Sequence, residues 1–168
     1  KTAAADLGYL NLLVDHDGTI RRIHLLKNNT NKEQLNPFSF SVAQQYNKQD
    51  QKFGQQQLLI NFKVQKNYFP QISYSQVLNN EFSADFFKNK IVLVGAKGNS
   101  FQDYLTTPVA AIKGYLPGVM IHAAIINNYL ENSFIKQTNT IQTLTLLIFF
   151  SLLSAGLYYK LTPLYSLI

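Results

Sequence analysis

The feature that most constrains this chain is an uncharged apolar run near its C-terminus. Residues 141–159 read IQTLTLLIFFSLLSAGLYY and include no charged side chain. At about 1.5 Å of rise per helical residue, the run is long enough to cross a hydrocarbon layer roughly 30 Å thick. Tyr158, Tyr159 and Lys160 resemble an aromatic belt followed by a cation at the headgroup level. The sequence predicts a transmembrane helix over residues 137–160, with a buried core helix as the alternative interpretation.

The rest of the chain divides around this helix. Residues 1–136 have the mixed composition of a soluble domain and are long enough to form a core. Residues 161–168 read LTPLYSLI, which we interpret as the truncated start of a second membrane segment. No secretory signal opens the chain, so we expect any exporting segment to lie upstream of Lys1 or to have been removed.

Charge and cysteine content exclude several classes of function. The chain has 15 Lys and Arg against 9 Asp and Glu, a net charge of +6, but the basic residues are scattered. Without a basic stripe, nucleic acid is not an expected partner, and anionic lipid headgroups are a better match for the charge. The absence of cysteine excludes disulfides, zinc–thiolate sites and cysteine nucleophiles.

Residue patterns in the soluble part predict a mixed α/β domain, in which helices flank a mixed sheet. An Asp-Gly turn at residues 15–18 separates two apolar segments, residues 9–14 and 19–26, and predicts a β-hairpin. Ser73 is a plausible N-cap for a helix that begins there. The other expected elements are a helix over residues 38–46, a strand over 58–62, a helical turn over 82–87 and a largely buried helix over 119–130.

The most strand-like stretch is Ile91–Val94, and Gly95 follows it. Continuous β-branched and apolar residues predict a strand buried on both faces, as in the middle of a partly parallel sheet. Open α/β sheets bind ligands at the C-terminal ends of such strands. The long segment from Gly95 to Gly118 is therefore the expected location of a binding site.

Five residues in or near this segment are candidate ligand contacts, each with a simpler structural interpretation. The loop Gly95–Ser100 follows a strand, as phosphate-binding loops do, but lacks their glycine order and more simply forms a turn. A lone buried histidine is more often a hydrogen-bonded core residue than a ligand, and three dispersed histidines predict no metal site. No nucleophile–base arrangement and no cofactor motif is present, so no catalytic residue is predicted. The candidates are Gly95, Lys97, Asp103, Thr107 and His122.

The order of these segments resembles the CHASE family of extracellular sensory domains, second type (cyclases/histidine kinases associated sensory extracellular). The resemblance is strongest in Lys90–Ala96 and covers nearly the whole soluble part. The other matching segments are Gly8–Asn11, Asp15–Arg22, Leu59–Phe62, Phe69–Leu78, Asp103, Thr107–Pro108, Pro117–Val119 and Ile121–Ala123.

The resemblance implies a bacterial receptor at the cell membrane, with residues 1–136 on the extracytoplasmic side. Similar proteins have an N-terminal anchor, several membrane helices, and a cytoplasmic adenylate cyclase, diguanylate cyclase, histidine kinase or serine/threonine kinase. The first anchor and further membrane helices are absent from this sequence, which is consistent with a piece of a longer protein. The family carries no defined ligand residues. The expected partners are an unknown small ligand or protein, the membrane, and a second copy in a homodimeric receptor.

We therefore interpret the chain as an extracytoplasmic sensory input domain without enzymatic activity of its own. In the expected mechanism, a signal near residues 95–108 shifts the helix 119–130, and residues 131–140 pass the shift to the membrane span. Two alternatives remain: a membrane-anchored interaction or dimerisation module, and an α/β enzyme acting on phosphorylated or nucleotide substrates through the Gly95 loop and Asp103.

Overall fold

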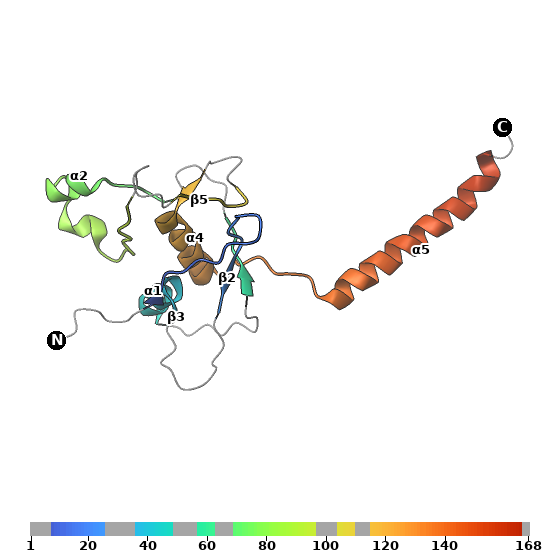
Figure 1. Ribbon diagram of the computed structural model, residues 1–168, viewed down its shortest axis with the longest axis horizontal. Coiled ribbons are helices and arrows are strands. Elements are labelled where there is room, and N and C mark those ends of the chain that lie inside the picture. Colours follow the sequence, from blue (N-terminus) through green and yellow to red (C-terminus); the bar gives the residue numbers. More distant parts are fainter. Residues whose placement is uncertain are drawn as a thin grey trace. The chain divides into compact units, whose positions relative to one another are not determined.

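The structure is a computed structural model that describes residues 8–25, 36–48, 57–62, 69–96, 104–109 and 115–165 (Figure 1). Two compact units divide the chain, Lys1–Ile135 and Lys136–Ile168. The first unit contains short strands and several helices, and the second contains one long helix. The mixed α/β fold class with a C-terminal apolar helix is thereby confirmed.

Short strand pairs, rather than one wide sheet, form the β-structure of the described residues. Strand β1 (Gly8–Tyr9) runs parallel to β3 (Asn36–Pro37). Strand β2 (Arg22–His24) is antiparallel to β4 (Gln57–Leu59), and β5 (Tyr104–Leu105) is antiparallel to β6 (Leu116–Pro117). An isolated parallel bridge between Thr19 and Thr106 joins two of these pairs, because the Ile20 N–H donates to the Thr106 carbonyl at 2.9 Å.

The predicted hairpin is only partly right. The turn forms as expected, since the Gly18 N–H donates to the Asp15 carbonyl at 2.9 Å and Gly18 has the positive φ of 78° that glycine tolerates. The segments on either side do not pair with each other as strands. Residues 10–14 lie outside any strand, because β1 pairs with β3 while β2 pairs with β4.

The helix predictions are confirmed to within a few residues. Helix α1 (Phe38–Asn47) and helix α4 (Gly118–Glu131) each end at a residue in the left-handed conformation, Lys48 and Asn132. Helix α2 (Tyr74–Leu78) begins at Ser73, whose hydroxyl and Gln76 form a capping box. A single 3₁₀ turn, η1 (Ala84–Phe87), covers most of the predicted helical turn.

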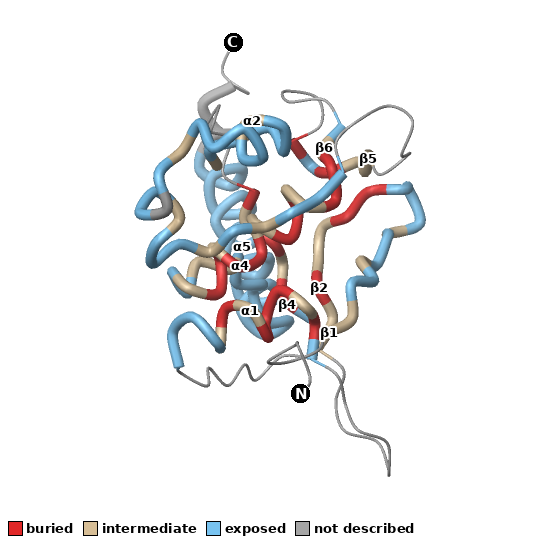
Figure 2. The backbone as a smooth tube through the Cα atoms, turned by 90° about the vertical axis from the view of Figure 1, so that its left-hand side faces the viewer, coloured by how far each residue is buried: buried red, intermediate tan, exposed pale blue. Residues whose placement is uncertain are grey.

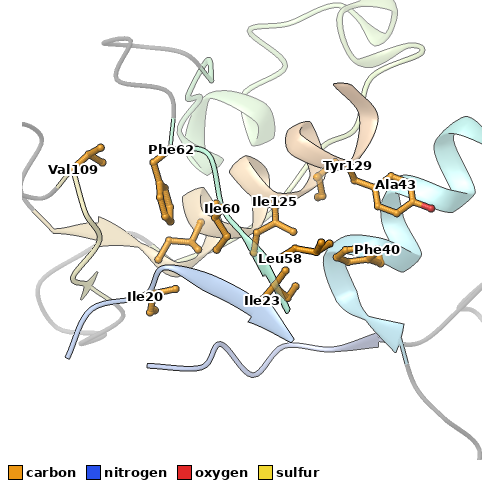
Figure 3. Close-up of a cluster of buried hydrophobic side chains, with 12 residues drawn as sticks. Ile20, Ile23, Phe40, Ala43, Leu58, Ile60, Phe62, Val109, Ile125 and Tyr129 are labelled. Carbon is orange, nitrogen blue, oxygen red and sulfur yellow. The ribbon is translucent and has the colours of Figure 1, made fainter. Parts of the chain in front are cut away.

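The core lies where α4 packs against the β2–β4 pair and α1 (Figure 3). Figure 2 shows the buried residues concentrated along these elements. Ile121, Ile125 and Tyr129 recur every four residues on one face of α4 and are fully buried. The Phe40 ring of α1 meets the Tyr129 ring edge-on, with centroids 4.9 Å apart. Ile23 of β2 and Leu58 of β4 also belong to this core, as do Ile20, Ile60 and Phe62, which lie just outside the two strands.

The predicted central strand at Ile91–Val94 is wrong in the described structure. Residues 91–96 form no ladder, and the side chains of Val92 and Val94 are 54% and 83% exposed. Ile91 and Leu93 do pack on the core, so the side chains alternate as in an extended segment. The prediction failed because β-branched residues favour an extended backbone, whereas a central strand also needs a neighbouring strand on each side.

The second unit contains helix α5 (Thr140–Tyr165). Its stretch Thr140–Lys160 is long and apolar enough to cross a membrane, and none of its side chains is buried. The hydroxyls of Thr145, Ser151 and Ser154 donate to carbonyls within the helix, at 2.8 to 2.9 Å. Such internal hydrogen bonds satisfy polar groups that hydrocarbon cannot.

Shortening a side chain at the centre of α4 tests whether this helix forms the centre of the hydrophobic core. Ile125→Ala removes a fully buried side chain and is expected to lower the free energy of unfolding by about 2–5 kcal/mol, through lost burial and a residual cavity. Leu78→Ala is the control, because Leu78 is mostly exposed and its loss should cost within about 0.5 kcal/mol. Thermal or denaturant unfolding of the two variants would measure this difference, and equal losses would contradict the assigned core.

Candidate functional site

An apolar cavity of about 630 Å³ lies beside the start of α4. This volume falls in the range of about 300–1,000 Å³ that is typical of small-molecule sites. Leu10, Leu12 and Val14 line one side of the cavity and residues 92–95 line another. The remaining described lining residues are Ile20, Phe38, Leu105, Gly118, Val119 and His122. Two of the predicted ligand contacts, Gly95 and His122, are therefore brought to the same cavity.

His122 is the one side chain with polar atoms among the described residues that line the cavity. Its Nδ1 lies 2.8 Å from the Ser39 Oγ, and Ser39 is fully buried in α1. The Phe38 ring meets the imidazole edge-on, with centroids 5.6 Å apart. This arrangement confirms the interpretation of His122 as a hydrogen-bonded core residue, and it also places an imidazole edge at the cavity wall.

Gly95 contacts the first turn of α4. A Cβ added to Gly95 would lie 2.5 Å from the Val119 Cβ and 2.9 Å from both Val119 methyl groups. No other residue type fits without displacing the helix or the segment 91–95, because real carbon atoms do not approach so closely. The cavity wall and α4 are therefore in direct contact at Gly95.

The other three predicted contacts lie elsewhere. Thr107 is buried, does not line the cavity, and its hydroxyl has no hydrogen-bond partner among the described residues. Lys97 and Asp103 lie outside the described residues. Their role in ligand binding stays a prediction, as does that of Thr107.

An ion cluster holds the 15–18 turn. Arg21 bridges two carboxylates, with its Nη1 2.9 Å from Asp15 Oδ2 and its Nη2 2.6 Å from Asp17 Oδ2. Arg22 adds a longer ion pair to Asp15 at 3.4 Å. The hydrogen bonds from Arg21 and from the Thr19 backbone hold the pKa of Asp17 well below its ordinary value near 3.8. The cluster is mutually neutralised, so it stabilises a turn rather than offering a charged site.

The end of α4 is fixed by an asparagine pair. The buried Asn128 side chain accepts from the Asn61 N–H at 2.6 Å and donates to the Asn61 carbonyl at 3.1 Å. The Asn61 side chain in turn donates to the Ser133 carbonyl at 3.1 Å, and the Ile135 N–H donates to the Leu59 carbonyl at 3.0 Å. The chain leaving α4 is thus bound to the segment that carries Asn61.

Sequence reasoning missed two parts of this arrangement. It assigns residues 10–14 to a hairpin strand, although the apolar residues Leu10, Leu12 and Val14 at every second position already indicate one apolar face. The Asn61–Asn128 pair joins residues 67 positions apart, and nothing local to either position signals it.

The arrangement defines a class of protein: an α/β domain with a ligand-sized apolar cavity, followed by a helix able to span a membrane. Among the described residues, no group of three His, Asp or Glu side chains forms a potential metal site. The family model of the CHASE2 domain matches residues 1–158, so the chain belongs to the CHASE2 domain family. These domains are extracellular sensory domains of signalling receptors and are not catalytic.

No curated protein matches the chain significantly, and no solved structure does. The functional class of the chain therefore rests on the family match, and the more specific proposals rest on the contacts of its described residues.

Adding one methyl group at Gly95 tests the contact with α4. Gly95→Ala is expected to lower the free energy of unfolding by about 1–3 kcal/mol, because the new Cβ overlaps the stiff, β-branched Val119. The double variant Gly95→Ala with Val119→Ala should lose less unfolding free energy than the two single variants lose in sum, because the shortened side chain leaves room for the new methyl group. Thermal unfolding of the four proteins measures the coupling, and strictly additive losses would contradict the contact.

Acid titration tests the ion cluster. Because the pKa of Asp17 is lower in the folded state, its stabilising effect is present above the ordinary pKa and fades as the pH falls below about 4. Asp17→Asn should therefore lower the melting temperature at pH 7, and the difference between the two proteins should shrink progressively as the pH falls below about 4. The effect should shrink in 1 M salt because the pair is exposed. A difference between the two proteins that persists unchanged at pH 2 would contradict the assignment.

Proposed function

We propose that this chain is the extracytoplasmic input domain of a transmembrane receptor, with α5 as a membrane span. The output domain proposed is a cyclase or a kinase on the cytoplasmic side, and the receptor is proposed to act as a homodimer. Support for the class comes from the CHASE2 family match, and support for the span comes from the apolar stretch of α5. The domain boundaries proposed are 1–136, 137–160 and 161–168.

The observation that carries the proposal is that one buried helix contacts the cavity at its start and the exit of the domain at its end. Val119 in the first turn of α4 touches Gly95 in the cavity wall. Asn128 in the last turn is bonded to Asn61, which also holds Ser133. A change at the cavity therefore displaces the same rigid element that positions the chain before residue 136.

Transmission through α4 requires that occupied and empty cavities favour different positions of this helix. A ligand shifts such an equilibrium only by its difference in affinity for the two states. Gly95 and Val119 both line the cavity and contact each other. A ligand in the cavity can therefore bind more tightly to one position of α4 than to another. The mechanism needs no change in secondary structure, only a small displacement of a packed helix.

The linker after α4 provides the test. In the full-length receptor, Gly95→Ala serves as a fixed disturbance of α4 and is expected to change the basal output activity measured in isolated membranes. A flexible Gly/Ser insertion between Ser133 and Thr140 should abolish the difference between the unsubstituted receptor and the Gly95→Ala receptor, because it disconnects α4 from the span.

The matched control is the same insertion after Asn80, in the exposed turn that follows α2. It should leave the effect of Gly95→Ala intact. An effect of Gly95→Ala that survives the linker insertion would contradict transmission through α4. The absence of any effect of Gly95→Ala in a folded receptor would contradict it as well.

The polar pair at the end of α4 gives a second, independent prediction. Asn128→Ala removes a buried side chain, leaves the half-buried Asn61 N–H without its acceptor, and is expected to lower the free energy of unfolding by about 1–3 kcal/mol. It should also reduce the change in output caused by Gly95→Ala. Asn127→Ala, at the neighbouring and less buried position, is the control. Thermal unfolding and output activity, measured together, separate lost coupling from lost folding.

A further inference from the structure

A second hollow, of about 340 Å³, lies between helix α2, the turn η1 and the extended segment 91–95. We propose that this hollow, the α2 groove, binds a small amphiphilic carboxylate, whose apolar body contacts the walls and whose carboxylate pairs with Lys90. The inference goes beyond the receptor role proposed above, because it concerns a different site and does not depend on transmission through α4. Two observations carry it: an aromatic wall that faces water, and a lysine whose ammonium lies over that wall.

The walls of the α2 groove are aromatic and aliphatic. Helix α2 contributes Tyr74 and Val77, and η1 contributes Phe86 and Phe87. The other described lining residues are Pro70, Ile72, Lys90 and the segment 91–95. No residue of α2 is buried, and Figure 2 shows this helix exposed. A ligand that covers these side chains removes apolar surface of the protein and of the ligand from water together.

The aromatic wall is packed before any ligand enters. The centroid of the Phe86 ring lies 4.8 Å from that of Phe82 and 5.1 Å from that of Phe87. Rings that are in contact with one another have little freedom left to lose when a third group covers them. Little of the binding free energy is therefore lost to ordering this part of the wall.

Lys90 places one positive charge at the groove. Its Nζ lies 4.0 Å from the centroid of the Phe86 ring, within the range in which a ring face attracts a cation. The ring occupies one side of the ammonium, which carries three N–H donors. Lys88 is near a carboxylate, with its Nζ 3.9 Å from Asp85 Oδ1, but Lys90 has no ion pair with a described residue. The charge of Lys90 is thus available to a carboxylate.

The wall and the lysine together select an anionic amphiphile. The Lys90 side chain is exposed, so an ion pair with it is weak by itself and screened by salt. The apolar walls therefore supply most of the affinity. The lysine supplies the preference for a carboxylate, through a charge-assisted hydrogen bond that a neutral or cationic ligand does not form.

The volume limits the size of the apolar body. The groove is near the lower end of the range of about 300–1,000 Å³ that is typical of small-molecule sites. One ring with a short alkyl chain is a small body of this kind, and the ring offers an edge or a face to Phe86 and Phe87. Phenylbutanoate has a ring, a short chain and a carboxylate, and it is the probe.

The experiment uses the whole chain in nanodiscs of zwitterionic lipid, with the methyl groups of Ile, Leu and Val labelled for NMR. Residues 92–95 line both hollows, but Val77 lines only the α2 groove of the two, so phenylbutanoate should shift its methyl resonances in a saturable way. Saturable shifts of Leu12 and Leu105, which line the cavity beside α4, with Val77 unchanged, would overturn the location. Shifts confined to α5, which report partition into the bilayer, would overturn binding at the groove as well.

Two lysines provide the first matched pair of variants. Lys90→Met removes the positive charge at the groove, whereas Lys88→Met removes the same charge from a side chain that does not line it. Lys90→Met should weaken phenylbutanoate binding by about three- to fivefold, the upper range for an exposed ion pair, and Lys88→Met by less than about twofold. Equal weakening by both variants would overturn the role of Lys90.

Two neighbouring residues of α2 provide the second matched pair. Val77 lines the groove, and Leu78 does not, although Leu78 is 65% exposed. Val77→Trp should weaken phenylbutanoate binding by about tenfold or more, because the indole occupies the groove, whereas Leu78→Trp should change it by less than about twofold. Equal weakening by these two variants would overturn the location of the site.

Three probes with the same phenylbutyl body test the charge of the ligand. At pH 7 phenylbutanoate should bind about three- to fivefold more tightly than phenylbutanol, and phenylbutylamine should bind most weakly, when all are referred to the free aqueous concentration. The advantage of phenylbutanoate over phenylbutanol should disappear in Lys90→Met and shrink in 1 M salt. Equal or tighter binding of phenylbutanol or phenylbutylamine to the unsubstituted chain would overturn the anionic class of ligand.

Discussion

The burial of α4 is the constraint on which the rest of the first unit depends. Its residues Ile121, Ile125 and Tyr129 are completely buried, and they contact elements that come from distant parts of the sequence. The strand pair β2–β4 and helix α1 both contribute side chains to the core cluster around α4, and this common contact holds them together. Short two- and three-residue strands are marginal by themselves and need such a partner.

The two ends of α4 are held in different ways, and the difference bears on the proposed transmission through this helix. At the start, Gly95 and Val119 touch through apolar atoms, a contact without direction that permits small sliding movements. At the end, Asn128 and Asn61 form two directed hydrogen bonds, which keep their geometry or break. A helix of 14 residues, about 21 Å long, thus has an adjustable contact at the cavity and a fixed contact at the exit.

The sequence predicted the parts of this arrangement that depend on neighbours along the chain. Periodicity identified α1 and α4, the Asp-Gly pair identified the turn, and Ser73 identified the start of α2. Sequence reasoning failed where the structure of a segment depends on which distant segment pairs with it. Residues 10–14 and 91–94 have the composition of paired strands, yet in the described structure Leu10, Leu12, Val14 and residues 92–94 line a cavity, because other segments take the positions beside β1 and β2.

The same failure explains why only part of the site was predictable. Gly95 is a candidate from sequence because it follows an apolar segment, and it does line the cavity, but the physical reason is its contact with Val119 rather than a phosphate-binding turn. The place of His122 on an apolar helix predicts its burial but not the Ser39 partner 83 residues away. The Asn61–Asn128 pair could not be found at all, since asparagine at either position also fits an exposed loop or a helix end.

The exposed valines at 92 and 94 connect the fold to its role. The segment keeps the side chains of Val92 and Val94 in water and forms no ladder with the described residues, while Ile91 and Leu93 attach it to the core. A ligand that covers exposed side chains of this kind shifts the equilibrium only if it binds one position of the segment better than another. In this domain that segment ends at Gly95, against the first turn of the most buried helix. In the proposed mechanism, a ligand that covers Val92 and Val94 therefore acts on a segment that touches the start of α4.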